Sequence, residues 1–482
     1  MNIKMVLHTI GKLLIVESSL LTLPLIVSLI YKENTYWSFI IPIIGLLILG
    51  ILLTIKKPQR KNLYAKEGMV LVGLSWILVS LAGCLPFIIS KQIPNFFDAF
   101  FETVSGFTTT GASILTDIEG QLSQSMLFWR SFTHWLGGMG VLVFVLAVLP
   151  SSEGQNIHIL KAESTGPQVG KLVSKVRVTA RILYLIYLVF TVLEVILLLI
   201  GKMNLFDSLI TAFGTAGTGG FSNKNDSVAS YSSYCQMVVA IFMLLFGINF
   251  NIFYFIIIGK VSQALKSEEL RTYLIIILVA TIVITFNLVY SINTAFPTAL
   301  KDSFFQVVSF MTSTGFISTN YDIWPELSQI ILFMLMWIGA CAGSTGGGMK
   351  VSRFLILFKS AKREIQKIVH PNSVTNISFE GSTLDEKVVK GVCNYFTVLI
   401  TIFVVAVILI SINGFDFATT LTAVTTAINN DGPGFGNVIG ATGNFASFSI
   451  FSKVVLCALM LIGRLEVYPI LILFSPKVWL NK

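Results

Sequence analysis

Long apolar stretches dominate this chain, and short polar segments separate them. Ten such stretches contain about 20 residues or more, and each could cross a ~30 Å hydrocarbon core as a helix. The pattern therefore predicts an all-α polytopic membrane protein. The predicted spans cover residues 9–31, 37–55, 69–90, 124–149, 181–201, 234–258, 272–292, 326–358, 390–412 and 448–474.

A second pattern occurs four times between these spans. An aspartate is followed 12 to 16 residues later by a glycine in a short polar loop. About ten residues separate the two, which is only ~15 Å of helix, too short to span and therefore predicted to re-enter the membrane. The four pairs are Asp98 and Gly111, Asp207 and Gly219, Asp302 and Gly315, and Asp416 and Gly432.

This repeat predicts the domain organisation. Its units are roughly 100 residues long, longer than the units of stacked repeat proteins, so each is expected to be a helix–pore loop–helix module. Four modules can enclose one pseudo-fourfold pore. Lys4 and Lys12 precede an apolar run without a small-residue cleavage site, which predicts a retained helix. The predicted units are an N-terminal transmembrane hairpin (1–66) and pore modules 67–180, 181–271, 272–388 and 389–482.

Basic residues indicate the orientation. They crowd into residues 56–66, 161–181, 260–271 and 359–367. By the positive-inside rule these loops and both termini are cytoplasmic, so the pore loops enter from outside. The net charge of +9 then needs no nucleic-acid partner.

The outer connections carry mostly acidic residues. Asp98, Glu102, Asp117 and Glu119 surround the first pore loop, with Lys91 as the opposing charge. An acidic mouth concentrates cations. The alternative is that translocated loops lack Lys and Arg for topological reasons alone.

The loops themselves suggest cation chemistry. Each aspartate can accept from the free N–H groups of a short helix, whose negative C-terminal end then points into the membrane. Glycine permits torsions that turn carbonyl groups toward an axis, and rings of carbonyls can replace the hydration shell of potassium. Coincidence could explain one such loop but hardly four. The predicted potassium-binding filter residues are Thr109, Thr110, Gly111, Gly217, Thr218, Gly219, Ser313, Thr314, Gly315, Asn430, Asp431 and Gly432.

These loops also carry a family resemblance. They read Thr108-Thr-Thr-Gly111, Thr218-Gly-Gly-Phe-Ser222, Thr312-Ser-Thr-Gly315 and Asn429-Asn-Asp-Gly-Pro-Gly-Phe-Gly436. Further matches are Trp129-Arg-Ser-Phe-Thr-His-Trp-Leu-Gly-Gly-Met-Gly140, Gly166-Pro-Gln-Val-Gly-Lys171 and Leu461-Ile-Gly-Arg-Leu-Glu466. The chain resembles the Trk/Ktr/HKT superfamily of potassium transporters over nearly its whole length, and its N-terminal hairpin resembles the bacterial Trk type.

The resemblance implies one pore formed by four modules with one filter glycine each. Gly111 resembles the potassium-conducting type, because serine at this position goes with sodium preference in the plant branch. Asp431 departs from the apolar residue expected there. Its carboxylate either faces the pore and binds ions or faces the protein and needs a buried partner.

The eighth span is too long for one helix. Residues 326–358 would extend ~50 Å, and the glycine-rich run 339–350 in its middle predicts a break. In the family the equivalent stretch is an intramembrane gate, and close helix packing on small residues is the alternative. Lys350 is followed by Val351, so a phosphate-binding P-loop is excluded. The predicted gate residues are Gly343, Ser344, Thr345, Gly346, Gly347, Gly348, Lys350 and Arg464.

Arg464 is a charge in the middle of the last span and needs an interior partner. Glu466 is two residues away and points to another helix face, so a direct pair is not expected. The family implies that Arg464 binds the gate carbonyls and obstructs cations; a structural ion pair is the alternative. Lys350 either contributes to the gate or snorkels to the interface.

Two modes of transport remain open. Four modules entered from one side favour a channel-like path for potassium, with some sodium as a second permeant ion. A carrier coupled to protons or sodium is the alternative, and Glu17, Glu194 and His134 would be its candidate relay. The chain has no HExxH, GxSxG or facing aspartate pair, which argues against an enzyme.

Cofactors and partners follow mainly from the resemblance. Five scattered cysteines and four histidines form no ligand set, so no covalent cofactor is expected and potassium is the transported ion. The family implies a homodimer in the bacterial cytoplasmic membrane. It also implies a cytoplasmic TrkA-like subunit that binds NAD(H), ATP or ADP, for which residues 359–391 are a plausible contact.

Overall fold

The computed structural model describes residues 2–56, 58, 64–140, 176–373 and 375–479. Within these ranges the chain is helical, apart from one hairpin of two short strands, β1 (Ser378–Phe379) and β2 (Ser382–Thr383). Six helical segments there are long and apolar enough to cross a membrane, and a bent helix pair would be a seventh. This agrees with the predicted all-α polytopic architecture.

Several predictions fall on residues that lie outside this description. They are residues 141–149 of the span 124–149, most of the basic loop 56–66, residues 161–175 of the basic loop 161–181, and the motif 166–171.

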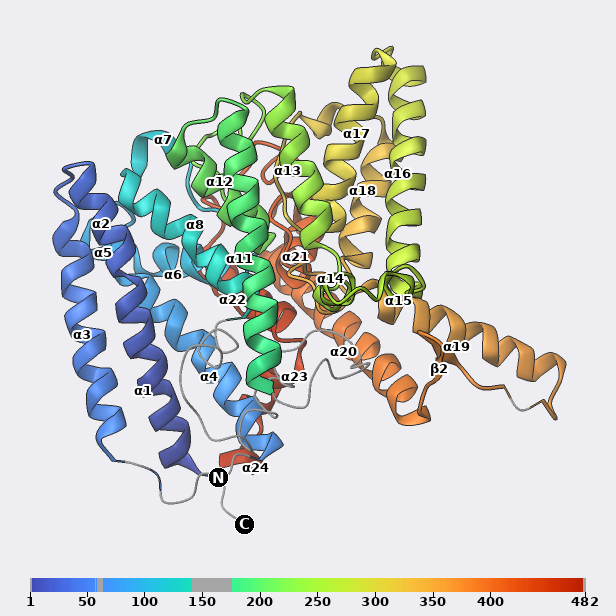
Figure 1. Cartoon of the computed structure of the whole chain (residues 1–482), viewed down its shortest axis with the longest axis horizontal. Coiled ribbons are helices and arrows are strands. Elements are labelled where there is room, and N and C mark those ends of the chain that lie inside the picture. Colours follow the sequence, from blue (N-terminus) through green and yellow to red (C-terminus); the bar gives the residue numbers. More distant parts are fainter. Residues whose placement is uncertain (1, 57, 59–63, 141–175, 374, 480–482) are drawn as a thin grey trace.

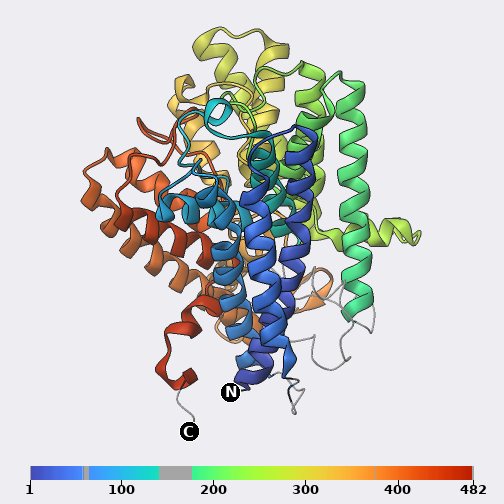
Figure 2. The ribbon, with the colours of Figure 1, turned by 90° about the vertical axis from the view of Figure 1, so that its left-hand side faces the viewer.

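The N-terminal helices lie together along one flank of the molecule (Figures 1 and 2). They are α1 (Ile3–Leu20), α2 (Thr22–Ile30) and α3 (Tyr36–Ile55). Small residues let α1 and α3 approach closely, since a Cβ atom on Gly50 would lie 2.6 Å from the Ile15 side chain. Glu33 accepts a hydrogen bond from the backbone of Gln124 (2.7 Å), which joins this hairpin to the rest of the fold.

The remaining chain repeats one order of elements four times: a long helix, a short helix, then a further helix. The short helices are α6 (Phe96–Phe107), α12 (Leu205–Gly217), α17 (Phe296–Met311) and α21 (Phe417–Asn429). Before them come α4 (Ala65–Gly83) with α5 (Leu85–Ile89), α11 (Val176–Ile200), α16 (Glu268–Ile292) and α20 (Glu386–Ile410). After them come α8 (Gln124–Gly138), α13 (Ser233–Phe246) with α14 (Phe250–Ile257), α18 (Glu326–Ile338) with α19 (Val351–Val369), and α22 (Ile450–Arg464).

Shorter helical turns fill the connections and the C-terminal segment. They are α7 (Ile118–Gln121), α15 (Val261–Leu265), α23 (Tyr468–Leu471), α24 (Pro476–Trp479) and the 3₁₀ turns η1 (Tyr321–Ile323), η2 (Ser411–Asn413) and η3 (Ile472–Phe474). The start of α1 and the helix α24 lie at the same end of the molecule (Figure 1). The helix α19 extends away from the rest of the fold.

Two predicted spans, 9–31 and 69–90, are each interrupted at one residue, between α1 and α2 and between α4 and α5. Three others differ more from a single helix. The predicted break in 326–358 is confirmed, because α18 ends at Ile338 and α19 begins at Val351. The continuous span 234–258 is wrong: α13 and α14 meet at 91°, and Asn249 starts α14 anew by accepting from the Asn251 N–H (3.0 Å). The span 448–474 ends early, since Glu466 and Val467 adopt positive φ angles of 54° and 72°.

The predicted role of the four aspartates as helix caps holds for only one of them. Asp416 caps α21 by accepting from the Thr419 N–H (3.0 Å). Asn95 and Asn204 cap α6 and α12 instead. The helix α17 begins at Phe296 with a proline in its first turn. Asparagine is as good a cap as aspartate, and proline suits the first turn, so these helices start before their aspartates.

Candidate ion pathway

The four loops that follow the short helices share one backbone conformation. In each, one loop residue donates its N–H to the carbonyl five residues earlier, with an N–O distance of 2.9 Å. In the first, third and fourth loops this donor directly precedes the predicted glycine. The residue before the donor has a positive φ of 54° to 56° in every loop. The donor–acceptor pairs are Thr110 and Ser105, Gly219 and Gly214, Thr314 and Ser309, and Asp431 and Thr426.

This equivalence corrects the second loop by one residue. Gly111 and Gly315 follow the donor and have φ angles of 80° and 78°. In the second loop the donor is Gly219 itself, and the residue after it, Gly220, has a φ of 71°. Gly220 is therefore the counterpart of the other filter glycines. Spacing alone could not choose between two adjacent glycines.

The loops meet in a closed ring. Each glycine lies against the next loop in chain order, and the fourth lies against the first, with no room for a Cβ atom between them. A built Cβ would collide as follows: on Gly111 with the Gly219 carbonyl oxygen, on Gly220 with the Thr314 carbonyl oxygen, on Gly315 with Pro433 (2.5 Å), and on Gly432 with the Thr110 carbonyl oxygen (3.0 Å). The structure thus brings all four predicted loops together through their backbones.

Side chains at the donor position turn back toward their own helices. The hydroxyl of Thr110 lies 2.8 Å from that of Thr108, and the hydroxyl of Thr314 lies 2.7 Å from that of Thr312. Asp431 occupies the same backbone position in the fourth loop. It is fully buried, and neither carboxylate oxygen has a hydrogen-bond partner among the described residues. Its position favours the interpretation that it faces the protein, but without the predicted partner.

A buried ion pair that the sequence did not reveal supports the ring. Arg130 on α8 binds Glu102 on α6 (2.6 Å), and both side chains are almost fully buried. Glu102 accepts from Ser113 and Ile114 as the first loop leaves the ring, while Arg130 donates to the Ser222 carbonyl of the second loop (2.9 Å). One ion pair therefore fixes two adjacent loops. Arg130 and Glu102 are 28 residues apart, so no local sequence motif predicts that they form an ion pair.

The glycine-rich loop 339–350 lies directly against this ring. The N–H of Gly347 donates to the Ser313 hydroxyl (2.5 Å), and the N–H of Gly348 donates to the Asn429 carbonyl (2.9 Å). On its other side the loop contacts the bend between α13 and α14, where the Cys341 N–H donates to the Gly247 carbonyl (3.0 Å). The break in the eighth span thus places polar backbone beside the third and fourth loops.

Two cationic side chains bind this loop. Arg464 donates to the carbonyls of Thr345 (3.0 Å), Gly138 (2.6 Å) and Gly137. Lys350 donates to the Gly346 carbonyl and is only 2% exposed, so it does not snorkel to the interface. Glu466 pairs with Arg353 (2.5 Å).

Of the remaining predicted gate residues, Gly343 and Ser344 lie on the far side of the loop. The Phe250 N–H donates to the Gly343 carbonyl (3.1 Å), and the Ser344 hydroxyl donates to the Cys341 carbonyl (2.6 Å). These contacts hold the loop in the bend between α13 and α14.

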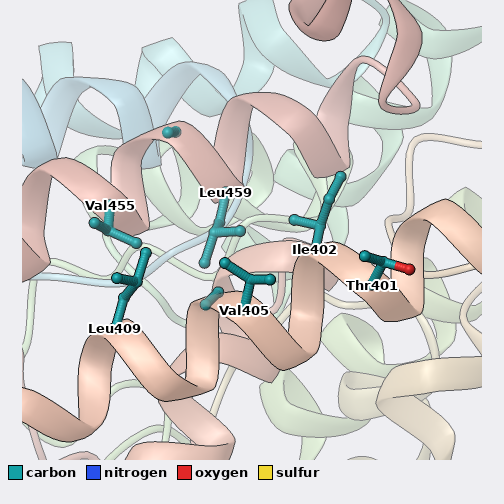
Figure 3. A pocket seen from close by; sticks show the side chains of 8 residues that line it. Thr401, Ile402, Val405, Leu409, Val455 and Leu459 are labelled. Carbon is teal, nitrogen blue, oxygen red and sulfur yellow. The ribbon is translucent and has the colours of Figure 1, made fainter.

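The outer loops add acidic groups. Asp117 accepts a hydrogen bond from the Asn225 side chain (2.9 Å), which lowers the pKa of the exposed Asp117 carboxyl and keeps it charged. By contrast, a hollow of about 340 Å³ between α20 and α22 is lined by apolar side chains apart from Thr401 (Figure 3). One hydroxyl cannot surround a cation, so the ring and the loop beside it are the better candidate pathway.

Together these features define a class: a helical, multi-pass membrane protein in which four loops after short helices meet in a ring. The chain matches the family model TrkH, described as cation transport protein, over residues 37–481. It belongs to this family. The family comprises transporters, not enzymes.

Known relatives match along the whole chain. The chain is 35% identical to the Trk system potassium uptake protein TrkH of Salmonella typhimurium strain LT2, covering 99% of this chain and all of the relative. It is 33% identical to the potassium uptake protein TrkG of Escherichia coli strain K12, with 99% of each chain covered. The crystal structure of the potassium transporter TrkH from Vibrio parahaemolyticus superposes with a TM-score of 0.89 at 31% identity, covering all of both chains. The fold is therefore that of TrkH.

Proposed function

We propose that the protein takes up potassium across the bacterial cytoplasmic membrane through a gated, channel-like pore. The observation that carries this proposal is the closed ring of four equivalent loops, each contacting the next through glycine and carbonyl groups. Backbone carbonyls in such a ring can replace the water around a potassium ion. The potassium uptake relatives at 35% and 33% identity support the choice of ion.

The four modules enclose one pseudo-fourfold axis, and the N-terminal hairpin lies outside them. The filter consists of the predicted loop residues together with Gly220, which is the filter glycine of the second loop. Both termini are cytoplasmic; the common location of α1 and α24 at one end supports this orientation. The pore loops then face outward, where Asp117 and its neighbours attract cations.

The loop 339–350 acts as the gate beneath the filter. Its contacts with Ser313 and Asn429 support this role, because they place it against two of the four loops. The charges of Arg464 and Lys350 at its carbonyls repel a passing cation. Transport therefore requires the loop and these charges to move.

Regulation requires further chains. The family membership supports a homodimer of this membrane subunit with a cytoplasmic nucleotide-binding partner. The exposed helix α19, which extends from the body, is the surface best placed for such a contact (Figure 1).

A second candidate is a symporter that couples potassium to protons or sodium. Glu17 and Glu194 favour it, because both are buried in long apolar helices without a hydrogen bond among the described residues. His134 is a weaker candidate, since its ring already contacts the Gly106 carbonyl (2.7 Å).

Purified protein in liposomes separates the two mechanisms. For the channel, we expect currents that reverse at the Nernst potential of potassium and do not respond to a pH or sodium gradient. A reversal potential that shifts with either gradient would establish the symporter. If the protein transports no potassium into liposomes, with or without a pH or sodium gradient, both mechanisms are refuted.

A further inference from the structure

A buried acid at the start of α16 holds the intramembrane loop. Glu269 is 4% exposed. One of its carboxylate oxygens accepts from the N–H of Ala342 (2.7 Å), inside the loop, and from the N–H of Ser352 (3.1 Å), in the first turn of α19. A single oxygen therefore binds the loop and the helix that follows it.

The ends of the loop already lie side by side. The N–H of Val351 donates to the Ala340 carbonyl (3.1 Å), and the N–H of Met349 donates to the Trp337 carbonyl (3.2 Å). Capping α19 would need only the bond from Ser352. The second bond, from Ala342, instead fixes the body of the loop against α16. Hydrogen bonds to a charged acceptor are about twice as strong as neutral ones. The bond between Glu269 and Ala342 therefore contributes strongly to holding the loop in this position.

A second acid fixes Glu269 from the cytoplasmic hairpin. Glu380 and Gly381 form the two-residue turn between β1 and β2, with φ angles of 52° and 72°, as type I′ turns require. The Glu380 carboxylate accepts from the N–H of Glu269 (3.0 Å) and from the hydroxyl of Ser267 (2.8 Å). The hairpin turn therefore binds the very residue that binds the loop.

The same hairpin is tied to α19. Lys359 donates to the Ser378 carbonyl (2.8 Å) and pairs with Glu268 (2.5 Å). Ser382 and Thr383 on the second strand are exposed. The hairpin is thus an accessible element that contacts both helices next to the loop.

We propose that Glu269 is a positioning residue that holds the gate loop closed, and that the hairpin 378–383 controls it through Glu380. A cytoplasmic partner that displaces the hairpin would remove Glu380 from the start of α16 and loosen the Glu269 contact with Ala342. This inference rests on the proposed gated pore, and it assigns the point at which regulation reaches the gate.

Potassium flux in liposomes tests the proposal with Glu269→Ala, Glu269→Gln and Glu380→Ala. We expect Glu269→Ala to raise basal flux about tenfold, which corresponds to the loss of one charge-assisted hydrogen bond. Glu269→Gln keeps an acceptor oxygen, so its basal potassium flux should stay close to that of the wild-type protein. Glu380→Ala should raise flux about threefold, and the double variant should not exceed Glu269→Ala, because both act on one contact.

The matched control is Glu326→Ala, which removes an exposed glutamate from the first turn of α18 in the same module; wild-type flux is expected. The potassium to sodium permeability ratio should stay unchanged in all these variants, because none touches the ring. A general loosening of the fold would change this ratio and lower the melting temperature, and would count against a positioning role.

The outcomes separate this inference from the proposed function. If Arg464→Ala raises flux but Glu269→Ala and Glu380→Ala behave like wild type, the inference is wrong and the gated pore stands. If neither the wild-type protein nor any variant conducts potassium, both the inference and the gated pore are wrong. Should Glu269→Ala fail to fold, wild-type flux in Glu380→Ala would overturn the inference.

Discussion

The ring of four loops, proposed as the filter, and the loop 339–350, proposed as the gate, are both buried, glycine-rich backbone, but they are held in different ways. In the ring, equivalent loops press against one another, and a Cβ atom at any of the four glycines would meet a neighbouring loop. The gate loop is a single segment whose position depends on side chains, chiefly Arg464, Lys350 and Glu269. Mutual steric contact resists displacement, whereas a few hydrogen bonds can be exchanged for others.

This difference suggests a division of labour. Changes in the ring should alter which ion passes, and changes at the gate loop should alter how much passes. The following experiments test that division, beginning with the largest expected effect.

The largest effect should follow loss of the ion pair behind the ring. Arg130→Ala leaves the Glu102 carboxylate buried without its partner, so the free energy of unfolding should fall by about 3–5 kcal/mol. We expect a clearly lower melting temperature in detergent and, in the protein that folds, a lower potassium to sodium permeability ratio. Arg363→Ala, which breaks a pair with the half-exposed Glu386, is the control and should change neither.

The next largest effect concerns a ring glycine. Gly111→Ser places a side chain against the Gly219 carbonyl at a φ of 80°, so the two loops must separate. A loss of about 2 kcal/mol in ion discrimination corresponds to a permeability ratio roughly 30 times lower. Bilayer recordings in mixed potassium and sodium measure it. The control is Gly391→Ser, since a Cβ there meets no atom within 4 Å; an unaltered ratio in Gly111→Ser would remove this glycine from the filter.

A smaller effect, of a different kind, is expected at the gate. Arg464→Ala removes one hydrogen bond to the loop, at the Thr345 carbonyl, and two to the carbonyls of Gly137 and Gly138 at the end of α8. Basal flux should rise about tenfold while the permeability ratio stays the same. Deletion of residues 343–348 should act in the same direction. Arg464→Lys keeps the charge and should retain part of the closure. The division between ring and gate fails if Arg464→Ala changes selectivity instead of flux.

The smallest effect is expected at Asp431. If its carboxyl group faces the protein without a partner, Asp431→Asn removes a buried acidic group. The free energy of unfolding should then rise by about 1–2 kcal/mol, with a slightly higher melting temperature. Potassium affinity should not change. A several-fold weaker apparent affinity for potassium would instead show that the carboxylate contacts the permeating ions.

The sequence predicted features that depend on local pattern. The apolar spans, the four short helices and the break at 339–350 all follow from hydropathy and glycine content. Features set by contacts between distant segments were not predictable. The 91° bend after Phe246 depends partly on the gate loop, which binds Gly247 from 94 residues further along the chain.

Site residues follow the same rule. The loop glycines were found because they recur, but the choice between Gly219 and Gly220 needed the hydrogen-bond register. The partners of Glu102 and Glu269 lie in other elements, so local sequence did not reveal these contacts. The position of Glu269 next to an apolar span was a weak signal, because a charge that is buried there needs an interior partner.

The ring is built by one polypeptide from four loops that differ at the donor position, where threonine stands twice and glycine and aspartate once each. In a symmetric assembly of identical chains, every codon change would appear at all four positions together. Here a single substitution changes one loop directly and its neighbour only through their contact. Such a ring can be altered during evolution one loop at a time.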